Sequence, residues 1–204
     1  ITDVTTGIRA DDMFTLLLID NNDIDANNAD VPASGTTGIY VTDSNNVQIG
    51  EGSFAGNTGN NIDDFATGIR VEGGNNVTID ANDITDGNNG IYADNVGGLK
   101  IFDNFADGRA GKPGNGSGYG IYVGNSFDAQ IGALNDGNTV EDYVVGIRVF
   151  NSDSADVKYN DVDETTWNGI EIASSDDVVV DRNTVDDSGW DNINVSDSNN
   201  ADIT

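Results

Sequence analysis

Arginine and tyrosine recur in this sequence at one position of a repeated four-residue phrase, Gly-Ile-x-Val. In chain order, the residues at x are Arg9, Tyr40, Arg70, Tyr92, Tyr122, Arg148, Glu171 and Asn194. Flat aromatic rings and planar guanidinium groups, with carboxylates beside them, can hold an acidic polysaccharide or another extended sugar chain. We therefore predict a carbohydrate-binding surface. Its predicted members are Arg9, Tyr40, Arg70, Glu72, Tyr92, Asp94, Tyr122 and Arg148.

The same column of residues also has a purely structural interpretation. Tyr and Arg stacked on neighbouring strands gain about 0.5–1 kcal/mol each from cation–π contact and packing at exposed sites. The arginines would also neutralise some of the many acids. Long segments before Tyr40, Arg70 and Tyr122 favour the binding interpretation, but both stay open.

The elements that would position these residues follow from the repeat itself. The phrase occurs eight times, with its Ile residues 22 to 31 positions apart, and a period of this size is typical of solenoid proteins. Apolar residues also lie two, eight and ten positions after each Ile, as in short strands that point alternate side chains to one face. If Ile and the residue two positions later face inward, x faces outward. The first three pairs at eight and ten positions are Leu16 with Leu18, Val47 with Ile49 and Val77 with Ile79.

A third short strand and a constant Asn complete each repeat. The third strand is predicted fifteen positions after the Ile, at Phe54, Ile84, Ala106, Val162 and Val185, with Val140 taking this place after a four-residue insertion. The Asn lies thirteen positions after the Ile, and Asn side chains stacked in register can bond to one another in a ladder. Its predicted members are Asn21, Asn82, Asn104, Asn138, Asn160 and Asn183, with Gly52 as the exception.

These features together resemble the right-handed parallel β-helix of the pectate-lyase-like superfamily. The resemblance covers the whole chain and implies an all-β solenoid of about eight coils. The length suits a single domain, residues 1–204, and since the chain begins and ends inside repeats, it is expected to be a segment of a larger protein. Variation in repeat length is expected after the third strand, in residues 24–37, 55–67 and 107–119. In the resembling lyases, loops at this place wall the substrate cleft. The last of these segments is rich in Gly and is predicted to be a surface loop rather than a phosphate cradle.

Two tryptophans lie at one equivalent place of adjacent repeats. Trp167 and Trp190 each come three residues before the Ile of their phrase, so they are expected to stack. Sugar binding and packing at a corner of the solenoid are both compatible with such a pair.

Catalytic chemistry has little support in the sequence. The chain has no His and no Cys, which excludes Ser-His, Cys-His and His-metal sites within it. By resemblance to Ca²⁺-dependent lyases, Arg70 or Arg148 would be the base and Glu72 or Asp94 would hold the metal. Glu72 and Asp94 could also form a hydrolytic carboxylate pair. No family motif accompanies either arrangement, so catalytic and metal residues remain unassigned.

The charge of the chain limits its partners. With 36 acidic and 8 basic residues and a formal charge of -28, it lacks the basic clusters that nucleic acids and anionic membranes require. No apolar run is long enough to span a membrane. The acidity fits turn chemistry, adaptation to high salt or Ca²⁺ binding, and Ca²⁺ is the one cofactor considered.

The leading hypothesis is a structural and adhesive segment of a secreted or cell-surface protein, with a polysaccharide or glycan surface as its partner. The competing hypothesis is a fragment of a polysaccharide lyase or epimerase. Bare end coils would expose unpaired strand edges, so end-to-end stacking of coils is a further expected contact.

Overall fold

The computed structural model describes residues 4–26, 35–50, 59–108 and 118–204. These residues form twenty-one β-strands and no helix. Within the described ranges, therefore, no helix is present that is long and apolar enough to cross a membrane. The predicted all-β class is confirmed.

The first strand of each repeat contains the Gly-Ile-x-Val phrase. These strands are β1 (Thr6–Asp11), β4 (Thr37–Gly50), β6 (Thr67–Asp80), β8 (Asn89–Asp94), β11 (Tyr119–Gly124), β14 (Val145–Phe150), β17 (Ile170–Ala173) and β20 (Ile193–Ser196). They pair in parallel, and each Ile of the phrase lies opposite the Ile of the neighbouring repeat.

The second and third strands follow through tight bends. The second strands are β2 (Leu17–Ile19), β9 (Lys100–Phe102), β12 (Gln130–Ile131), β15 (Asp156–Lys158), β18 (Val179–Asp181) and β21 (Asp202–Ile203), and β4 and β6 continue through the bend to the same place. The third strands are β3 (Asp23–Asp25), β5 (Asn61–Asp63), β7 (Asp83–Gly87), β10 (Phe105–Gly108), β13 (Thr139–Glu141), β16 (Asp161–Asp163) and β19 (Thr184–Val185).

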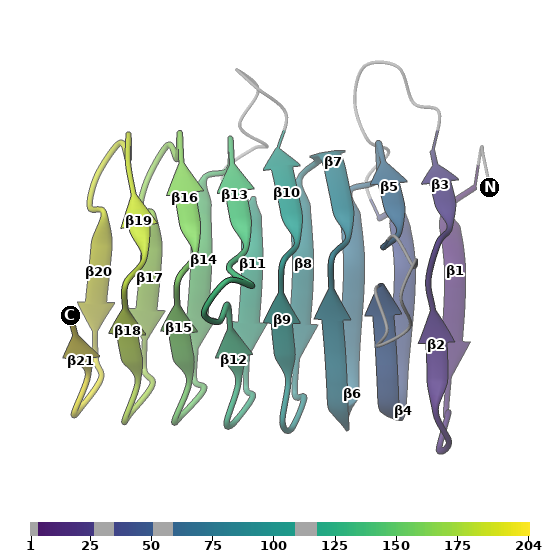
Figure 1. The fold of residues 1–204 in the computed structure, drawn as a ribbon, viewed down its shortest axis with the longest axis horizontal. Coiled ribbons are helices and arrows are strands. Elements are labelled where there is room, and N and C mark those ends of the chain that lie inside the picture. The colour runs from purple at the N-terminus through teal and green to yellow at the C-terminus, as the bar shows by residue number, and fades with distance from the viewer. Residues whose placement is uncertain (1–3, 27–34, 51–58, 109–117) are drawn as a thin grey trace.

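The strands form a parallel β-solenoid whose turns stack along the long axis of the molecule (Figure 1). The first strands make the rear layer in this view, and the second and third strands run in the opposite direction in the front layer. The sheet of third strands has seven members, so complete turns are slightly fewer than the eight predicted.

The inward residues of the phrase form the core. Ile39, Ile69, Ile91 and Ile121 are 0% exposed, as predicted from the two-residue period. The Gly before each Ile makes this packing close. A Cβ at Gly68 would lie 2.3 Å from Cγ2 of Ile84 and 2.9 Å from the carbonyl oxygen of Gly90. Only glycine therefore lets the first strand start this near the third strand.

An Asn ladder runs along the bend between the second and third strands. Nδ2 of Asn82 donates to Oδ1 of Asn104 at 2.9 Å, and Nδ2 of Asn104 donates to Oδ1 of Asn138 at 3.0 Å. The same Nδ2 atoms also donate to backbone carbonyl oxygens in the preceding turn. The predicted ladder is confirmed. Its members are Asn22, Asn60, Asn82, Asn104, Asn138, Asn160 and Asn183.

The prediction was wrong by one residue in the first repeat. Leu17 and Ile19 lie opposite Val47 and Ile49, whereas Leu16 is 76% exposed. The bend of this repeat contains one residue more than the others, so the inward set shifts by one along the chain. For the same reason, the ladder begins with Asn22 rather than Asn21.

The second repeat differs from the prediction in the place of its insertion. Ile62 of β5 pairs with Ile24 and Ile84, and Asn60 takes the ladder position. Gly52 and Phe54, which were assigned to these places, lie outside the described residues. The register puts the extra residues before the ladder Asn rather than after the third strand. The prediction for the Gly-rich segment falls mainly on residues 109–117, which are also outside the described part of the chain.

A second polar ladder, of serines, lies in the bend after the first strand and was not predicted. The backbone N–H of Ser126 donates to Oγ of Ser152, and that of Ser152 donates to Oγ of Ser175. Each of these hydroxyls donates in turn to the carbonyl oxygen two residues earlier. The residue before the ladder position has a positive φ in every described turn, which explains why Asp, Asn, Gly and Ser dominate there. These residues are Asp12, Asp43, Gly73, Asn95, Asn125, Asn151, Ser174 and Asp197.

Candidate functional site

The outward residues of the phrase form one continuous column on the first-strand sheet. Strand register pairs each of them with the next, from β1 to β20. We call this set the Arg/Tyr column. It consists of Arg9, Tyr40, Arg70, Tyr92, Tyr122, Arg148, Glu171 and Asn194.

Side chains of the Arg/Tyr column stack on one another along the axis of the solenoid. The guanidinium carbon of Arg70 lies 5.9 Å from the ring centroid of Tyr40 and 4.8 Å from that of Tyr92. The rings of Tyr92 and Tyr122 are parallel within 10°, with centroids 4.7 Å apart. Because neighbours cover most ring faces, the column presents ring edges, hydroxyl groups and guanidinium edges to solvent. It can recognise a sugar by hydrogen bonds more readily than by stacking on ring faces.

The N-terminal part of the column is a hydrogen-bonded ion-pair network centred on Glu72. Nη2 of Arg70 donates to Oε1 of Glu72 at 2.5 Å, and the hydroxyl of Tyr40 donates to Oε2 at 2.5 Å. The hydrogen bond from Arg70 holds the pKa of Glu72 below its usual value, and the bond from Tyr40 adds to this. Glu72 in turn raises the pKa of Arg70 and of Tyr40. Arg9 has a looser partner, Asp11, at 3.9 Å.

The C-terminal part of the column is a cluster of three tyrosines capped by Arg148. Tyr119, which lies two residues before Ile121, packs on Tyr122 with centroids 5.2 Å apart and planes at 44°. Arg148 lies 5.7 Å from the ring centroid of Tyr119, and its Nη1 lies 3.0 Å from Oε1 of Glu171. Burial raises the pKa of Tyr92 and of Tyr122. Tyr119 was not predicted as a member of this surface, because it lies outside the Gly-Ile-x-Val phrase.

The residues considered for catalysis lie together, but the ion pair between Arg70 and Glu72 opposes the role of Arg70 as a base. Glu72 and Asp94 face each other on β6 and β8, as predicted. A base at Arg70 would require a neutral guanidine, yet Glu72 raises the pKa of Arg70. The lowered pKa of Glu72 keeps this carboxylate ionised, which excludes it as the general acid of a carboxylate pair but suits a Ca²⁺ ligand. Asp94 accepts a hydrogen bond from Nδ2 of Asn125 at 2.7 Å.

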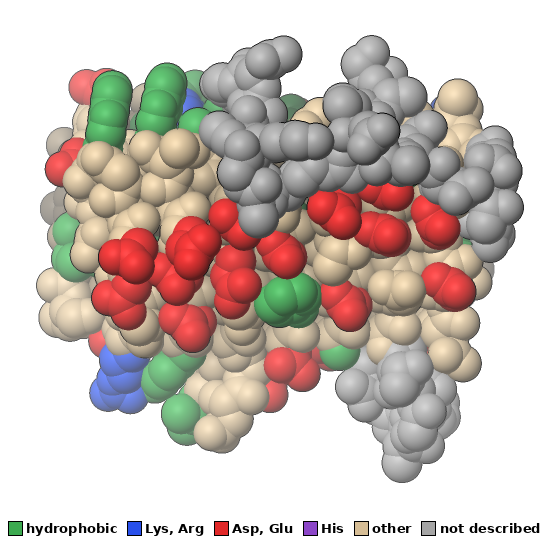
Figure 2. Space-filling model, turned by 90° about the horizontal axis from the view of Figure 1, so that it is seen from above, with side chains coloured by type: hydrophobic (Ala, Val, Ile, Leu, Met, Phe, Trp, Pro, Cys, Tyr) green, Lys and Arg blue, Asp and Glu red, His purple; other side chains and the backbone are tan. Residues whose placement is uncertain are grey.

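A band of carboxylates, here called the acid band, lies along the third strands and the bends that follow them. It was not predicted from the sequence. Figure 2 shows acidic side chains gathered along the length of the molecule, seen from the edge where the third strands end. At least one acid adjoins the inward residue of each third strand, a signal that the sequence does contain. The members on these strands and the following bends are Asp23, Asp25, Asp63, Asp64, Asp83, Asp86, Asp107, Glu141, Asp142, Asp161, Asp163, Glu164, Asp186 and Asp187.

Burial and neighbouring carboxylates raise the pKa of some members of this acid band. Burial raises the pKa of Asp107 to about 6, and the nearby carboxylates of Asp142 and Glu141 add to the shift. Oδ1 of Asp107 is buried and has no hydrogen-bond partner among the described residues. The pKa of Glu141 is also raised, by burial and by Asp163.

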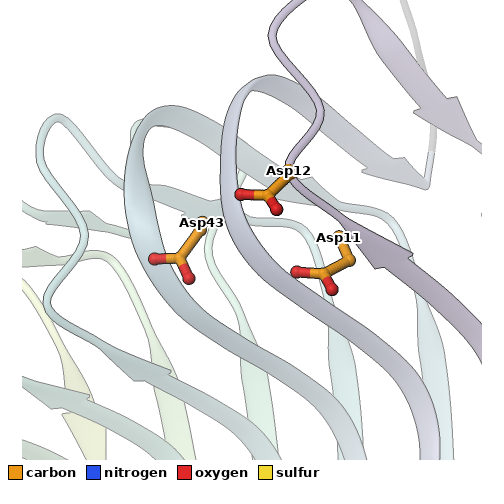
Figure 3. A group of neighbouring side chains, drawn as sticks. All are labelled: Asp11, Asp12 and Asp43. Atoms are coloured by element: carbon orange, nitrogen blue, oxygen red, sulfur yellow. The ribbon is translucent and has the colours of Figure 1, made fainter.

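Two groups of three aspartates have the geometry of a cation site. Carboxylate oxygens of Asp25, Asp63 and Asp64 lie within 4.8 Å of one another, as do those of Asp11, Asp12 and Asp43. The group of Asp11, Asp12 and Asp43 is exposed and lies between the end of β1 and the bend within β4 (Figure 3). Three carboxylate oxygens fit the hard oxygen ligands that Ca²⁺ prefers. Positive φ values at Asp12, Asp43 and Asp64 explain the residue type at these places without a metal.

The two tryptophans stack as expected. Their ring centroids are 5.1 Å apart with an interplanar angle of 8°, and Trp190 is 69% exposed. The backbone N–H of Trp190 donates to the carbonyl oxygen of Trp167, and that of Trp167 donates to the carbonyl oxygen of Val144. Val144 occupies the equivalent place and is buried. The backbone of the pair therefore continues this corner of the solenoid, while both rings lie exposed on its outside.

Comparisons with known proteins agree on the fold. The family model described as right handed beta helix region matches residues 6–143 and again residues 67–204. A search of curated protein sequences found no significant match.

Two solved structures of a bacteriophage tailspike are similar to the chain. The enzymatically active domain of tailspike protein 2 from bacteriophage CBA120 has a TM-score of 0.60 and 19% identity, over 87% of this chain and 32% of that one. Full-length tailspike protein 2 from an Escherichia coli O157:H7 bacteriophage has a TM-score of 0.61 and 19% identity, over 87% and 29%. The chain therefore spans about a third of the length of these tailspike chains, and the likeness concerns the fold.

Proposed function

Because the chain belongs to the right-handed β-helix family, we propose that it is a structural and adhesive segment of a secreted or cell-surface protein that binds polysaccharide along its Arg/Tyr column. The observation that carries this proposal is the unbroken register of the column across the first-strand sheet. Function on this fold must be argued from such a site, since the fold itself hosts many activities.

The repeat of the column supports an extended ligand. Successive turns of a parallel solenoid are about 4.8 Å apart, which is close to the length of a sugar residue. A polysaccharide lying along the column would therefore meet equivalent donors and acceptors at successive residues. Weak contacts repeated in this way add up to useful affinity when one chain spans several of them.

The test is retention of glycans by a double variant. Tyr92→Ala with Tyr122→Ala removes the stacked pair at the centre of the column, and we expect at least about a tenfold loss of retention on a glycan array. The melting temperature should change little, because both rings lie on the outer face. Tyr159→Ala is the matched control, since Tyr159 forms an Arg–Tyr stack with Arg182 elsewhere on the solenoid. Unchanged retention by the double variant would reject the column as the binding surface.

A polysaccharide lyase or epimerase fragment is the alternative. It is supported by the similarity to a tailspike domain that is described as enzymatically active. Incubation with pectate, alginate and glycosaminoglycans in the presence of Ca²⁺, followed by ultraviolet detection of unsaturated products, separates the two functions. Reproducible product formation would replace the purely adhesive proposal.

A further inference from the structure

The two parts of the Arg/Tyr column differ in how much of their hydrogen-bonding capacity is already used. In the N-terminal part, Glu72 accepts from both Arg70 and Tyr40, and these three side chains satisfy one another. A ligand that bound here would have to break or share these charge-assisted bonds, which are the strong ones in proteins. This part of the column is therefore poorly prepared for a sugar.

The C-terminal part has free hydroxyl groups instead. Within the described part of the chain, the hydroxyls of Tyr92, Tyr119 and Tyr122 have no hydrogen-bond partner in the protein, and the three rings lie half-buried. A phenol can both donate and accept, so each of these groups can pair with a sugar hydroxyl. The rings are fixed by their mutual stacking, so little freedom is lost when a ligand binds.

Gly124 is the residue that makes room for the side chain of Tyr122. It lies two residues after Tyr122, at the place where the other turns have Thr42, Glu72, Asp94 and Phe150. A Cβ at Gly124 would lie 2.6 Å from the hydroxyl of Tyr122 and 2.8 Å from Oδ1 of Asp94. The Tyr122 side chain and the Asp94 carboxylate therefore already fill the space over Gly124, and a donor and an acceptor lie close together above it.

The charges around the three tyrosines favour an uncharged ligand. The two flanking cations are already paired, Arg70 with Glu72 and Arg148 with Glu171, and the side chains of the second pair are only 26% and 14% exposed. Asp94 adds a carboxylate beside the Tyr122 hydroxyl, and the chain as a whole has a formal charge of -28. An anionic sugar would meet like charge here, whereas neutral sugar hydroxyls match the mixed donors and acceptors.

We infer that Tyr92, Tyr119 and Tyr122, arranged around Gly124, form a subsite for a neutral, hydroxyl-rich glycan, in which a sugar hydroxyl donates to Asp94 and accepts from the hydroxyl of Tyr122. This inference rests on the proposed function and specifies its ligand class and location. Gly124 is a positioning residue in this subsite, since its lack of a side chain allows Tyr122 to lie along the strand.

Affinity electrophoresis tests the ligand class. The protein is run in native gels containing laminarin, galactomannan or dextran as neutral probes, and alginate or polygalacturonate as acidic probes, at low and at high salt. We expect retardation by at least one neutral polysaccharide that persists at high salt, because screening has little effect where the ligand carries no charge.

Two variants test the location. Gly124→Ala places a methyl group against the Tyr122 side chain and displaces it, and Tyr122→Phe removes one hydroxyl while keeping the ring stack. Loss of one net hydrogen bond corresponds to a decrease in affinity of about threefold to tenfold, which is expected for Tyr122→Phe. Tyr159→Phe is the control, because its hydroxyl contacts Arg182 away from the column. Circular dichroism melts should stay close to that of the parent for Tyr122→Phe, whereas a lower melting temperature is expected for Gly124→Ala.

The outcomes are distinguishable. Stronger retardation by the acidic probes, reversed by salt, would overturn the neutral-glycan inference but leave the proposed polysaccharide binding in place. Neutral binding that neither variant weakens would overturn the subsite. Retardation by no probe at all, together with no retention on the array, would contradict the proposed function and the inference with it.

Discussion

At the scale of single residues, Glu72 links two members of the Arg/Tyr column. Its two oxygens accept bonds from Arg70 on the same strand and from Tyr40 on the preceding turn. Only one third of the Glu72 side chain is exposed, so solvent screens these bonds in part. Glu72 therefore joins two turns of the solenoid through its side chain, in addition to their backbone pairing.

The variant Glu72→Gln tests this role, because its effect on the stability of the fold should depend on pH. The lowered pKa of Glu72 means that its ionised form stabilises the fold above its ordinary pKa of 4.5, and that this contribution is lost as pH falls through the lower folded value. At neutral pH we expect the variant to be less stable by about 1 kcal/mol, allowing for partial exposure. Urea unfolding at neutral and acid pH measures the difference, which should shrink at acid pH. A difference that is independent of pH would contradict the argument.

At the scale of secondary-structure elements, the polar ladders stabilise the bends. Asn104 is 1% exposed, and its amide bonds to Asn138 and to backbone carbonyls, while its oxygen accepts from Asn82. A buried bend without such partners would leave backbone groups unsatisfied. The ladder thus lets the chain turn sharply inside a packed structure.

Asn104→Ala should be strongly destabilising. It leaves buried donors and acceptors on both neighbouring turns without partners, at an expected cost of about 3 kcal/mol. Asn183 provides a graded comparison, because it accepts from Asn160 but lies only half-buried on a later turn. We expect Asn183→Ala to cost about half as much in chemical unfolding experiments. Equal costs at the two positions would argue against burial as the source of the effect.

At the scale of the whole molecule, the acid band opposes the stacking of the turns. Parallel register brings carboxylates of neighbouring third strands opposite one another, as Asp107 with Glu141 and Glu141 with Asp163. The solenoid core holds these like charges together despite their repulsion. Salt should therefore stabilise the molecule.

Asp107→Asn should stabilise the protein at neutral pH. Since the folded pKa of Asp107 is raised from 3.8 to about 6, the folded state binds a proton more tightly than the unfolded state, and stability from this group falls as pH rises between these values. Asp107→Asn removes this loss of stability, because Asn carries no charge at any of these pH values. Melting temperatures at low salt should be higher for the variant at neutral pH and should converge towards acid pH. Asp136→Asn, an exposed position on another bend, is the control, and an equal effect there would indicate net charge alone.

The sequence by itself determined the repeat, the strand faces and most of the Asn ladder. Ile69 and Val71 could be assigned to the core and Arg70 to the surface, because a strand alternates its side chains between two faces. The resemblance to β-helix proteins then led to the correct fold. These inferences depend on local periodicity, which the chain carries in each copy.

Only the tertiary structure decided what depends on register and on contacts between turns. Leu16, Leu17 and Leu18 are equally apolar, and only pairing with the next turn shows which of them is buried. In the same way, the choice of Asn60 over Gly52 rests on the partners that a ladder residue finds in other turns. The meeting of Tyr122 and Asp94 above Gly124 and the use of Glu72 by its neighbours were likewise hidden, because they arise where side chains from different repeats meet.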